Sequence, residues 1–116
     1  MPGVRVNGAL TLGENIADNV GLSMAWKAYQ ASLDGKAAPV IEGLTGPERF
    51  FISYAQSWMG KVREENLIRL LKTDPHAPMD IRTNEAVRNL DAFHETFGTA
   101  PGDPMWLSPA SRIHLW

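Results

Sequence analysis

The 116-residue sequence contains no cysteine, which excludes a disulfide framework, a thiolate nucleophile and a thiolate metal site. It has no excess of basic residues either, since 11 Lys and Arg stand against 13 Asp and Glu. Without a positive field to neutralise phosphates, nucleic acid is not expected as a partner. No apolar run approaches the length that spans a bilayer, and the first residues lack the apolar core of a signal peptide, so neither a membrane segment nor a targeting signal is expected.

The sequence also lacks the short catalytic motifs of common hydrolases. No G-x-S-x-G occurs, and no glycine-rich loop resembles a phosphate cradle. A zinc protease of the H-E-x-x-H type needs two imidazoles one helical turn apart, but the residue four positions after His94 is Gly98. The chain is therefore not expected to assemble a three-ligand zinc site of this kind from its own residues.

Length and composition are those of one globular domain. Hydrophobic residues make up 44% of the chain and charged residues 21%, so a single core is expected. Apolar residues at helical spacing predict helices at residues 12–33, 47–59, 62–72 and 84–97. The predicted fold class is mainly α, with about four packed helices, long loops and little β-structure.

Polar residues mark where these helices are expected to start. Thr11 with Glu14, and Thr45 with Glu48, have the spacing of a capping box, and Thr83 is a further candidate N-cap. Apolar side chains occupy more than one face of the first helix. This pattern predicts that the first helix is largely enclosed by the rest of the protein.

Glu14 and Asp18 are four residues apart in the first predicted helix, so their carboxylates project from one face. A carboxylate can be one ligand of a catalytic zinc, and a neighbouring carboxylate can orient a ligating imidazole. The alternative is that Glu14 closes the capping box with Thr11 and that Asp18 faces solvent. On spacing alone the capping box is the favoured interpretation.

The histidines differ in what their surroundings predict. His76 lies in a proline-rich loop six residues before Arg82, and the pair could direct an imidazole N–H and a guanidinium at a carbonyl, an oxyanion or a carboxylate. A surface histidine and a surface arginine are the alternative. His94 falls on an apolar helix face, which favours a hydrogen-bonded core histidine, and His114 is expected to pack or to face water. The tryptophans and Phe50-Phe51 are interpreted as core.

The run V-N-G-A-L-T-L-G-E-N-I-A-D-N-V-G at residues 6–21, with a downstream D-x-H-x-P-x-x-x-R that ends at Arg82, resembles the neprilysin family of zinc metallopeptidases. That family includes the endothelin-converting enzymes and bacterial oligopeptidases, and in it the first of these segments supplies the third zinc ligand. The similarity covers essentially the whole chain. It continues through Phe50-Phe51, Ala55 to Trp58, Lys72 to Pro78, Arg82 to Asn84, Asn89, Phe93, Phe97, Gly102 to Met105 and Arg112 to Trp116.

The resemblance implies a role for each of four residues. Glu14 is the implied zinc ligand, Asp18 orients a ligating histidine, His76 stabilises the oxyanion of the reaction, and Arg82 holds a substrate carbonyl or carboxylate. These roles favour the ligand interpretation of Glu14, because a side chain directed at zinc cannot also reach the N-cap amide. The implied activity is zinc-dependent endopeptidase action on peptide substrates, with Zn²⁺ as cofactor of the parent enzyme.

The sequence departs from the family pattern before Glu14. Only 13 residues precede it, whereas in the family an H-E-x-x-H helix and an N-A-F/Y strand come earlier in the chain. The expectation is therefore the C-terminal part of a larger zincin-like catalytic domain, with the rest of the peptidase chain as its partner. Alone, such a part is expected to be inactive, to bind no zinc and to self-associate through exposed apolar surface.

The sequence also gives indications of the source of the protein, its location and an alternative class of function. Ser111 and Arg112 stand where vertebrate relatives have a cysteine, so the resemblance favours a bacterial-type enzyme without disulfides. It also indicates the periplasm, the cell surface or secretion. The alternative is a catalytically dead helical module that binds other proteins, which is expected to be monodisperse and to lack an exposed apolar patch.

Overall fold

The computed structural model describes residues 3–115. These residues form five α-helices and one short 3-10 turn: α1 (Gly8–Ser32), α2 (Gly46–Ser57), α3 (Glu64–Thr73), α4 (Met79–Arg88), α5 (Asp91–Phe97) and η1 (Pro109–Ser111). The β-structure of this part of the chain is one antiparallel bridge between Ile41 and Leu44. The predicted mainly α fold is confirmed. No helix among the described residues combines the length and apolarity needed to cross a membrane.

The first helix starts four residues before the predicted start. Asn7 caps α1, since its side-chain oxygen accepts hydrogen bonds from two backbone amides of the first turn at 3.1 and 3.2 Å. Thr11 lies inside the helix, where its hydroxyl donates to the Asn7 carbonyl and accepts from the Asn15 side chain. The predicted capping box of Thr11 and Glu14 is therefore wrong, and Glu14 is released for other contacts.

The second predicted helix begins as its sequence indicated. The Thr45 amide donates to a Glu48 carboxylate oxygen at 2.7 Å, and the Glu48 amide donates to the Thr45 hydroxyl at 3.3 Å. These reciprocal bonds form the predicted capping box at the start of α2. The helix ends at Ser57, close to the predicted end, and α3 follows after an extended segment.

The last predicted helix, at 84–97, is two helices in the structure. Thr83 is not an N-cap, because it lies within α4 and its hydroxyl donates to a carbonyl one turn back. The break falls where Leu90 adopts an extended conformation, and this side chain is buried in the core. Asn89 closes α4 by donating its side-chain amide to the Glu85 carbonyl at 2.9 Å. α5 ends at Phe97, the predicted end of the helix, and the C-cap residue Gly98 adopts a left-handed conformation.

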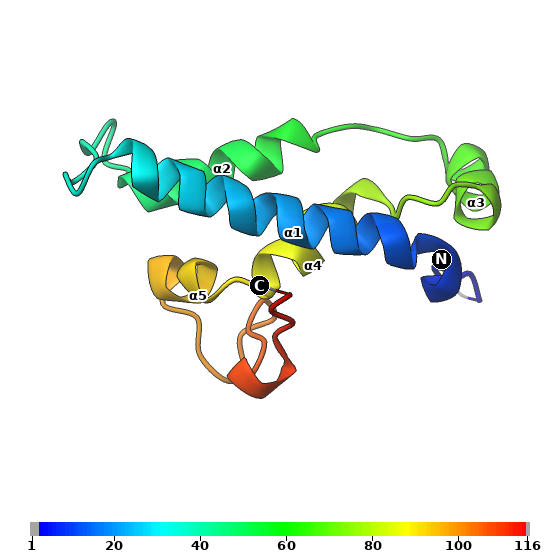
Figure 1. The fold of residues 1–116 in the computed structure, drawn as a ribbon. Coiled ribbons are helices and arrows are strands. Elements are labelled where there is room, and N and C mark those ends of the chain that lie inside the picture. The colour runs from blue at the N-terminus through cyan, green and yellow to red at the C-terminus, as the bar shows by residue number, and fades with distance from the viewer. Residues whose placement is uncertain (1–2, 116) are drawn as a thin grey trace.

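α1 packs against α4, and α2 packs against α4 and α5, while α3 stands at the end of the molecule where α1 begins (Figure 1). The shared core lies where these helices meet. Trp26 of α1 stacks on Phe51 of α2 with ring centroids 5.4 Å apart, and Phe93 of α5 meets Phe51 edge-on at 5.6 Å. The buried apolar cluster consists of Leu22, Phe51, Ala86, Val87 and Leu90. The core interpretation is confirmed for Phe51, which is buried, and for Trp26 and Phe50, which pack against it, whereas Trp116 lies outside the described residues.

His94 is a core histidine, as predicted. Its side chain is buried, and Nε2 donates to the Arg88 carbonyl at 2.9 Å. Because a carbonyl only accepts, Nε2 carries the proton, and Nδ1 accepts from the Thr99 hydroxyl. Both ring nitrogens are thus satisfied by structural contacts that join α4, α5 and the following turn.

The chain exposes more surface than a compact monomer of its mass. Its accessible area is 7926 Å², against about 6,300 Å² for an average folded protein. Its radius of gyration is 15.8 Å, whereas a compact domain of this length has a radius of gyration of about 13 Å. In α1 the side chains of Leu12, Ile16 and Met24 are exposed, and only Thr11 and Leu22 are buried. The predicted enclosure of the first helix is wrong for this chain, because no described element covers that apolar face.

The substitution Gly46→Ala is expected to destabilise the fold by about 1–3 kcal/mol, the usual cost of overpacking. Gly46 starts α2, and a Cβ atom there would collide with the Tyr29 hydroxyl and the Ala38 side chain. The matched control is Gly21→Ala in α1, where a Cβ meets nothing within 4 Å and the helix preference of Ala stabilises by about 1 kcal/mol. Urea unfolding followed by circular dichroism measures both changes. If both substitutions changed the free energy of unfolding in the same direction, the predicted collision at Gly46 would be contradicted.

Candidate functional site

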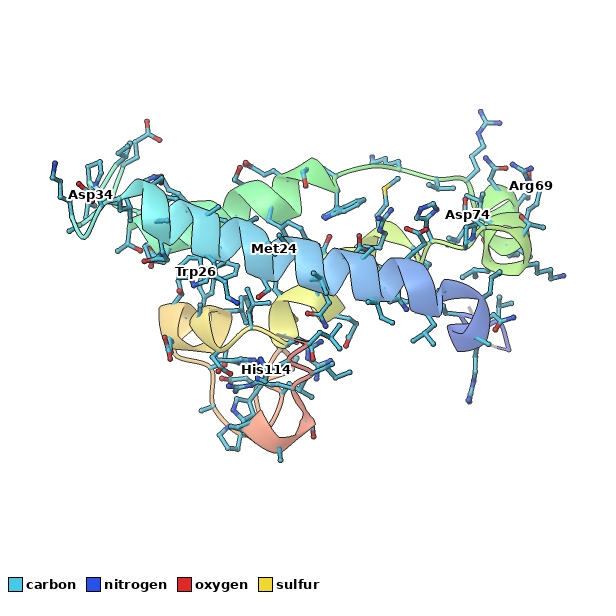
Figure 2. All side chains as sticks on the ribbon, viewed as in Figure 1. Met24, Trp26, Asp34, Arg69, Asp74 and His114 are labelled. Carbon is cyan, nitrogen blue, oxygen red and sulfur yellow. The ribbon has the colours of Figure 1, made fainter. Side chains whose placement is uncertain are left out.

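The four residues predicted for the site lie together around the N-terminal half of α1. α1 carries Glu14 and Asp18, the loop between α3 and α4 carries His76, and α4 carries Arg82. Figure 2 labels Asp74, which belongs to the same loop and lies between α3 and this part of α1. The site is therefore assembled by the packing of α1 on α4, which brings together segments about 60 residues apart in sequence.

Arg82 and Asp18 form a bidentate ion pair. Arg82 Nε donates to one Asp18 oxygen at 2.7 Å and Nη2 donates to the other at 2.8 Å. The side chains are only 18% and 14% exposed. Trp58, the C-cap residue of α2, covers the guanidinium, with Cζ of Arg82 lying 4.0 Å from the ring centroid. The hydrogen bonds to Asp18 raise the pKa of Arg82 further, so this group stays charged.

His76 lies between two carboxylates. Its Nδ1 atom and its backbone amide are both 2.8 Å from one oxygen of Asp74. Because an ionised carboxylate only accepts hydrogen bonds, Nδ1 carries a proton. Nε2 consequently faces the other side, where a Glu14 oxygen lies 3.3 Å away. The side chains of His76 and Glu14 are 43% and 44% exposed, so this half of the site is open to solvent.

Hydrogen bonds from His76 lower the pKa of Asp74. The backbone amide of His76, and then its ring N–H, donate to the carboxylate and lower the pKa of Asp74 below its ordinary value. The ionised carboxylate in turn fixes which ring nitrogen of His76 is protonated and where Nε2 points. Asp74 therefore orients the imidazole that faces Glu14.

The loop that holds His76 is expected to loosen in acid. A carboxyl group whose pKa is lowered by folding stabilises the folded loop above its unfolded pKa of about 3.9, and this contribution is lost as the pH falls through the lowered value. NMR titration of the His76 amide from pH 6 to pH 2 should follow Asp74. In Asp74→Asn this acid transition should disappear, whereas Asp80→Asn should leave it unchanged. Persistence of the transition in Asp74→Asn would contradict the assignment.

The site offers one position of a metal-ligand set. Among residues 3–115 no group of three His, Cys, Asp or Glu side chains is placed to hold a metal ion. Glu14 fits a single zinc position, because its carboxylate is not used as a cap and is half-exposed next to Asp18. His114 lies outside this site, with its Nε2 atom 3.9 Å from a carboxylate oxygen of Asp91. Its side chain is exposed, which is one of the two alternatives predicted for it.

Sequence reasoning missed three side chains of the site. The D-x-H spacing of Asp74 and His76 is that of a carboxylate that bonds a backbone amide two residues ahead, and this signal could have found Asp74. Tyr54 of α2 and its C-cap residue Trp58 both contact Arg82. Their spacing of one helical turn gave only the pattern of a core-facing helix, so no local signal marks them.

The fold of this chain matches one part of a solved zinc metalloprotease. The structure of the zinc metalloprotease Zmp1 of Mycobacterium tuberculosis in its open state aligns with 99% of this chain with a TM-score of 0.96 and 49% sequence identity. The chain corresponds to 18% of that protein. The model of peptidase family M13 matches residues 1–113, and the chain belongs to this family.

Curated relatives agree with this membership. The chain is 45% identical to the human membrane metallo-endopeptidase-like 1 and 43% identical to neprilysin-1 of Caenorhabditis elegans, over 96% and 97% of its length. It is 41% identical to endothelin-converting enzyme 1 of Bos taurus over 98% of its length. The chain spans only about 15% of the length of these relatives. The predicted resemblance to the neprilysin family is confirmed.

Proposed function

We propose that this chain is the part of a zinc-dependent metalloendopeptidase that supplies one zinc ligand, the orientation of a second ligand, and the groups that bind the scissile peptide. The carrying observation is the convergence of Glu14, Asp18, His76 and Arg82 from three separate segments onto one partly exposed site. Membership of the M13 family supports zinc as the cofactor and peptides as the substrates. The rest of the peptidase chain is the proposed partner.

Glu14 is proposed to hold zinc together with two imidazoles from outside this chain. When bound, zinc supplies a Lewis acid for the peptide carbonyl and lowers the pKa of a water molecule. Asp18 is proposed to accept the second ring N–H of one of those imidazoles. Both Asp18 oxygens already accept from Arg82, but each carboxylate oxygen has a further lone pair for this bond.

His76 and Arg82 are proposed to bind the peptide. His76 would donate from Nε2 to the carbonyl oxygen on which negative charge develops, while the contact of Nδ1 with Asp74 keeps the ring in this orientation. Arg82 would donate to a substrate carbonyl or carboxylate from the part of its guanidinium that Asp18 leaves open. The proton of the attacking water has to go to a base outside this chain, since no described carboxylate is left for that task near Glu14.

A chimera tests the proposal. This chain would replace the matching segment of mycobacterial Zmp1, with which it aligns at a TM-score of 0.96. The chimera is expected to bind zinc and to cleave peptides, whereas the 116-residue chain alone is expected to do neither. A folded chimera that binds no zinc, or zinc-dependent cleavage by the pure chain alone, would overturn the proposal.

The isolated chain is expected to bind the dye ANS and to self-associate. Exposed apolar side chains on α1, including Leu12 and Ile16, and an accessible surface of 7926 Å² motivate this expectation. A self-standing interaction module, the alternative function, should be a clean monomer without dye binding. Light scattering and ANS fluorescence on one sample separate the two. Dye-free monomers would favour the module.

The family relationship also supports proposals on source and location. Identity of 49% to a mycobacterial protein, against 45% to the human relative, supports a bacterial enzyme. One relative is named as a membrane metallo-endopeptidase-like protein, which supports placement at the cell surface, in the periplasm or outside the cell. Fractionation of the source cells with an antibody to this chain tests the location.

A further inference from the structure

Tyr54 of α2 and Trp58, the residue that caps the C-terminal end of α2, contact the same residue of α4. The Tyr54 hydroxyl donates to the backbone carbonyl of Arg82 at 3.0 Å. The Trp58 ring covers the guanidinium of Arg82, 4.0 Å from Cζ. The C-terminal end of α2 and its capping residue thus contact both the backbone and the side chain of Arg82, while Asp18 of α1 binds one edge of the guanidinium.

These contacts leave one part of the guanidinium open. Asp18 takes Nε–H and one hydrogen of Nη2, so both hydrogens of Nη1 and the second hydrogen of Nη2 remain. Among the described residues no acceptor engages these remaining donors. Trp58 blocks one face and Asp18 blocks one edge, so these two side chains fix the direction from which a further acceptor can approach.

We propose that Tyr54 and Trp58 are positioning residues that fix Arg82 so that its Nη1 edge is presented to the acceptor it binds. The peptide carbonyl or carboxylate as that acceptor rests on the proposed function, whereas the fixing of Arg82 does not. Neither residue needs to touch the peptide for this role. Both act by removing rotational freedom from a long side chain, which otherwise opposes binding.

The surroundings of the two residues suit this role. Burial raises the pKa of Tyr54, so the hydroxyl remains a donor throughout the neutral range. Arg82 lies in the first turns of α4, where its carbonyl also belongs to the helix, so the bond from Tyr54 ties the whole turn to α2. A partly desolvated cation over an indole is the stronger form of this contact.

NMR of the Arg82 Nε–H group in the full 116-residue chain tests the positioning. In the wild-type chain this resonance should be shifted upfield by the Trp58 ring and should exchange slowly with water. Tyr54→Phe should keep the fold and speed this exchange about fivefold, the effect of one net hydrogen bond. Trp58→Phe should keep part of the upfield shift, and Trp58→Leu should lose it. Tyr29→Phe, a hydroxyl deletion beside Gly46, is the matched control.

Each outcome decides the proposal. The proposal would be overturned if the Arg82 Nε–H exchanged at the same rate in Tyr54→Phe, or if its resonance had the same shift in Trp58→Phe and Trp58→Leu. Either result would mean that the two side chains pack against Arg82 without fixing its position. In the Zmp1 chimera, Tyr54→Phe should raise KM about fivefold at constant zinc content, and a loss of zinc instead would overturn it. If the NMR result holds while the unsubstituted chimera is inactive, the positioning stands and the proposed function fails.

Discussion

Glu14→Gln is expected to lower both the zinc affinity and the peptidase activity of the chimera by more than about a hundredfold, since even residues that only touch a metal ligand cost 10–100-fold when replaced. The amide keeps the size of the side chain but is a poor zinc ligand, because it is neutral and zinc prefers an anionic oxygen. In the structure the Glu14 side chain is 44% exposed and makes no helix cap, so its replacement should cost little stability.

The matched control is Glu65→Gln, an exposed glutamate of α3 outside the site. It should leave zinc content, kcat and KM unchanged. Zinc is measured by metal analysis of the purified chimera, and activity by cleavage of a quenched fluorescent peptide. A Glu14→Gln chimera that keeps its zinc and loses only activity would assign Glu14 to the reaction rather than to the metal, and would contradict the proposed ligand.

The two candidate capping boxes show how far local sequence predicts helix ends. Thr45 and Glu48 form their box because no better cap precedes them, and α2 starts where predicted. Thr11 and Glu14 have the same spacing, yet Asn7 lies one turn earlier and its side-chain oxygen accepts from the first amides. The cap that comes first in the chain starts the helix, so the second pattern ends up inside it. This is what leaves Glu14 for the site.

The break between α4 and α5 shows what local sequence cannot predict. Neither Asn89 nor Leu90 is a strong helix breaker, so periodicity joined the two helices into one. In the structure the extended Leu90 is buried next to Phe51 and Val87, and this contact with α2 exists only after the helices pack. Tertiary burial therefore decided a boundary that residue preferences left open.

The candidate site, like the helix boundaries, was predicted from the sequence only in part. The spacing of Glu14 and Asp18 predicted that they share a helix face, and the resemblance implied a role for each of the four residues. Neither indicated that Arg82 pairs with Asp18, since the two are 64 residues apart and meet only through the packing of α1 on α4. Pairings across such distances follow from the fold, so the sequence indicated four residues of the candidate site but neither their pairing nor the contacts of Asp74, Tyr54 and Trp58.

Breaking the pair of Asp18 and Arg82 is expected to destabilise the chain by about 2–4 kcal/mol, because the partner left behind is a mostly buried, uncompensated charge. Asp18→Asn keeps the shape of the side chain, and Arg82→Met keeps most of its apolar contact with Trp58. For a chain with so small a core, such a loss is a large fraction of the total stability.

A double-mutant cycle isolates the pairwise term. Urea unfolding of the two single variants and of the double variant should give a coupling energy of about 2 kcal/mol, since contacting charged residues couple by 0.5–3 kcal/mol. Glu85→Gln, which removes an exposed partner of Arg88, is the matched control and should cost about 0.5 kcal/mol or less. If the two single changes simply added, α1 and α4 would be held together by their apolar contacts alone. The ion pair would then orient the side chains of the site without stabilising the fold. The packing of the two helices would position Asp18 and Arg82, and the ion pair would not position the helices.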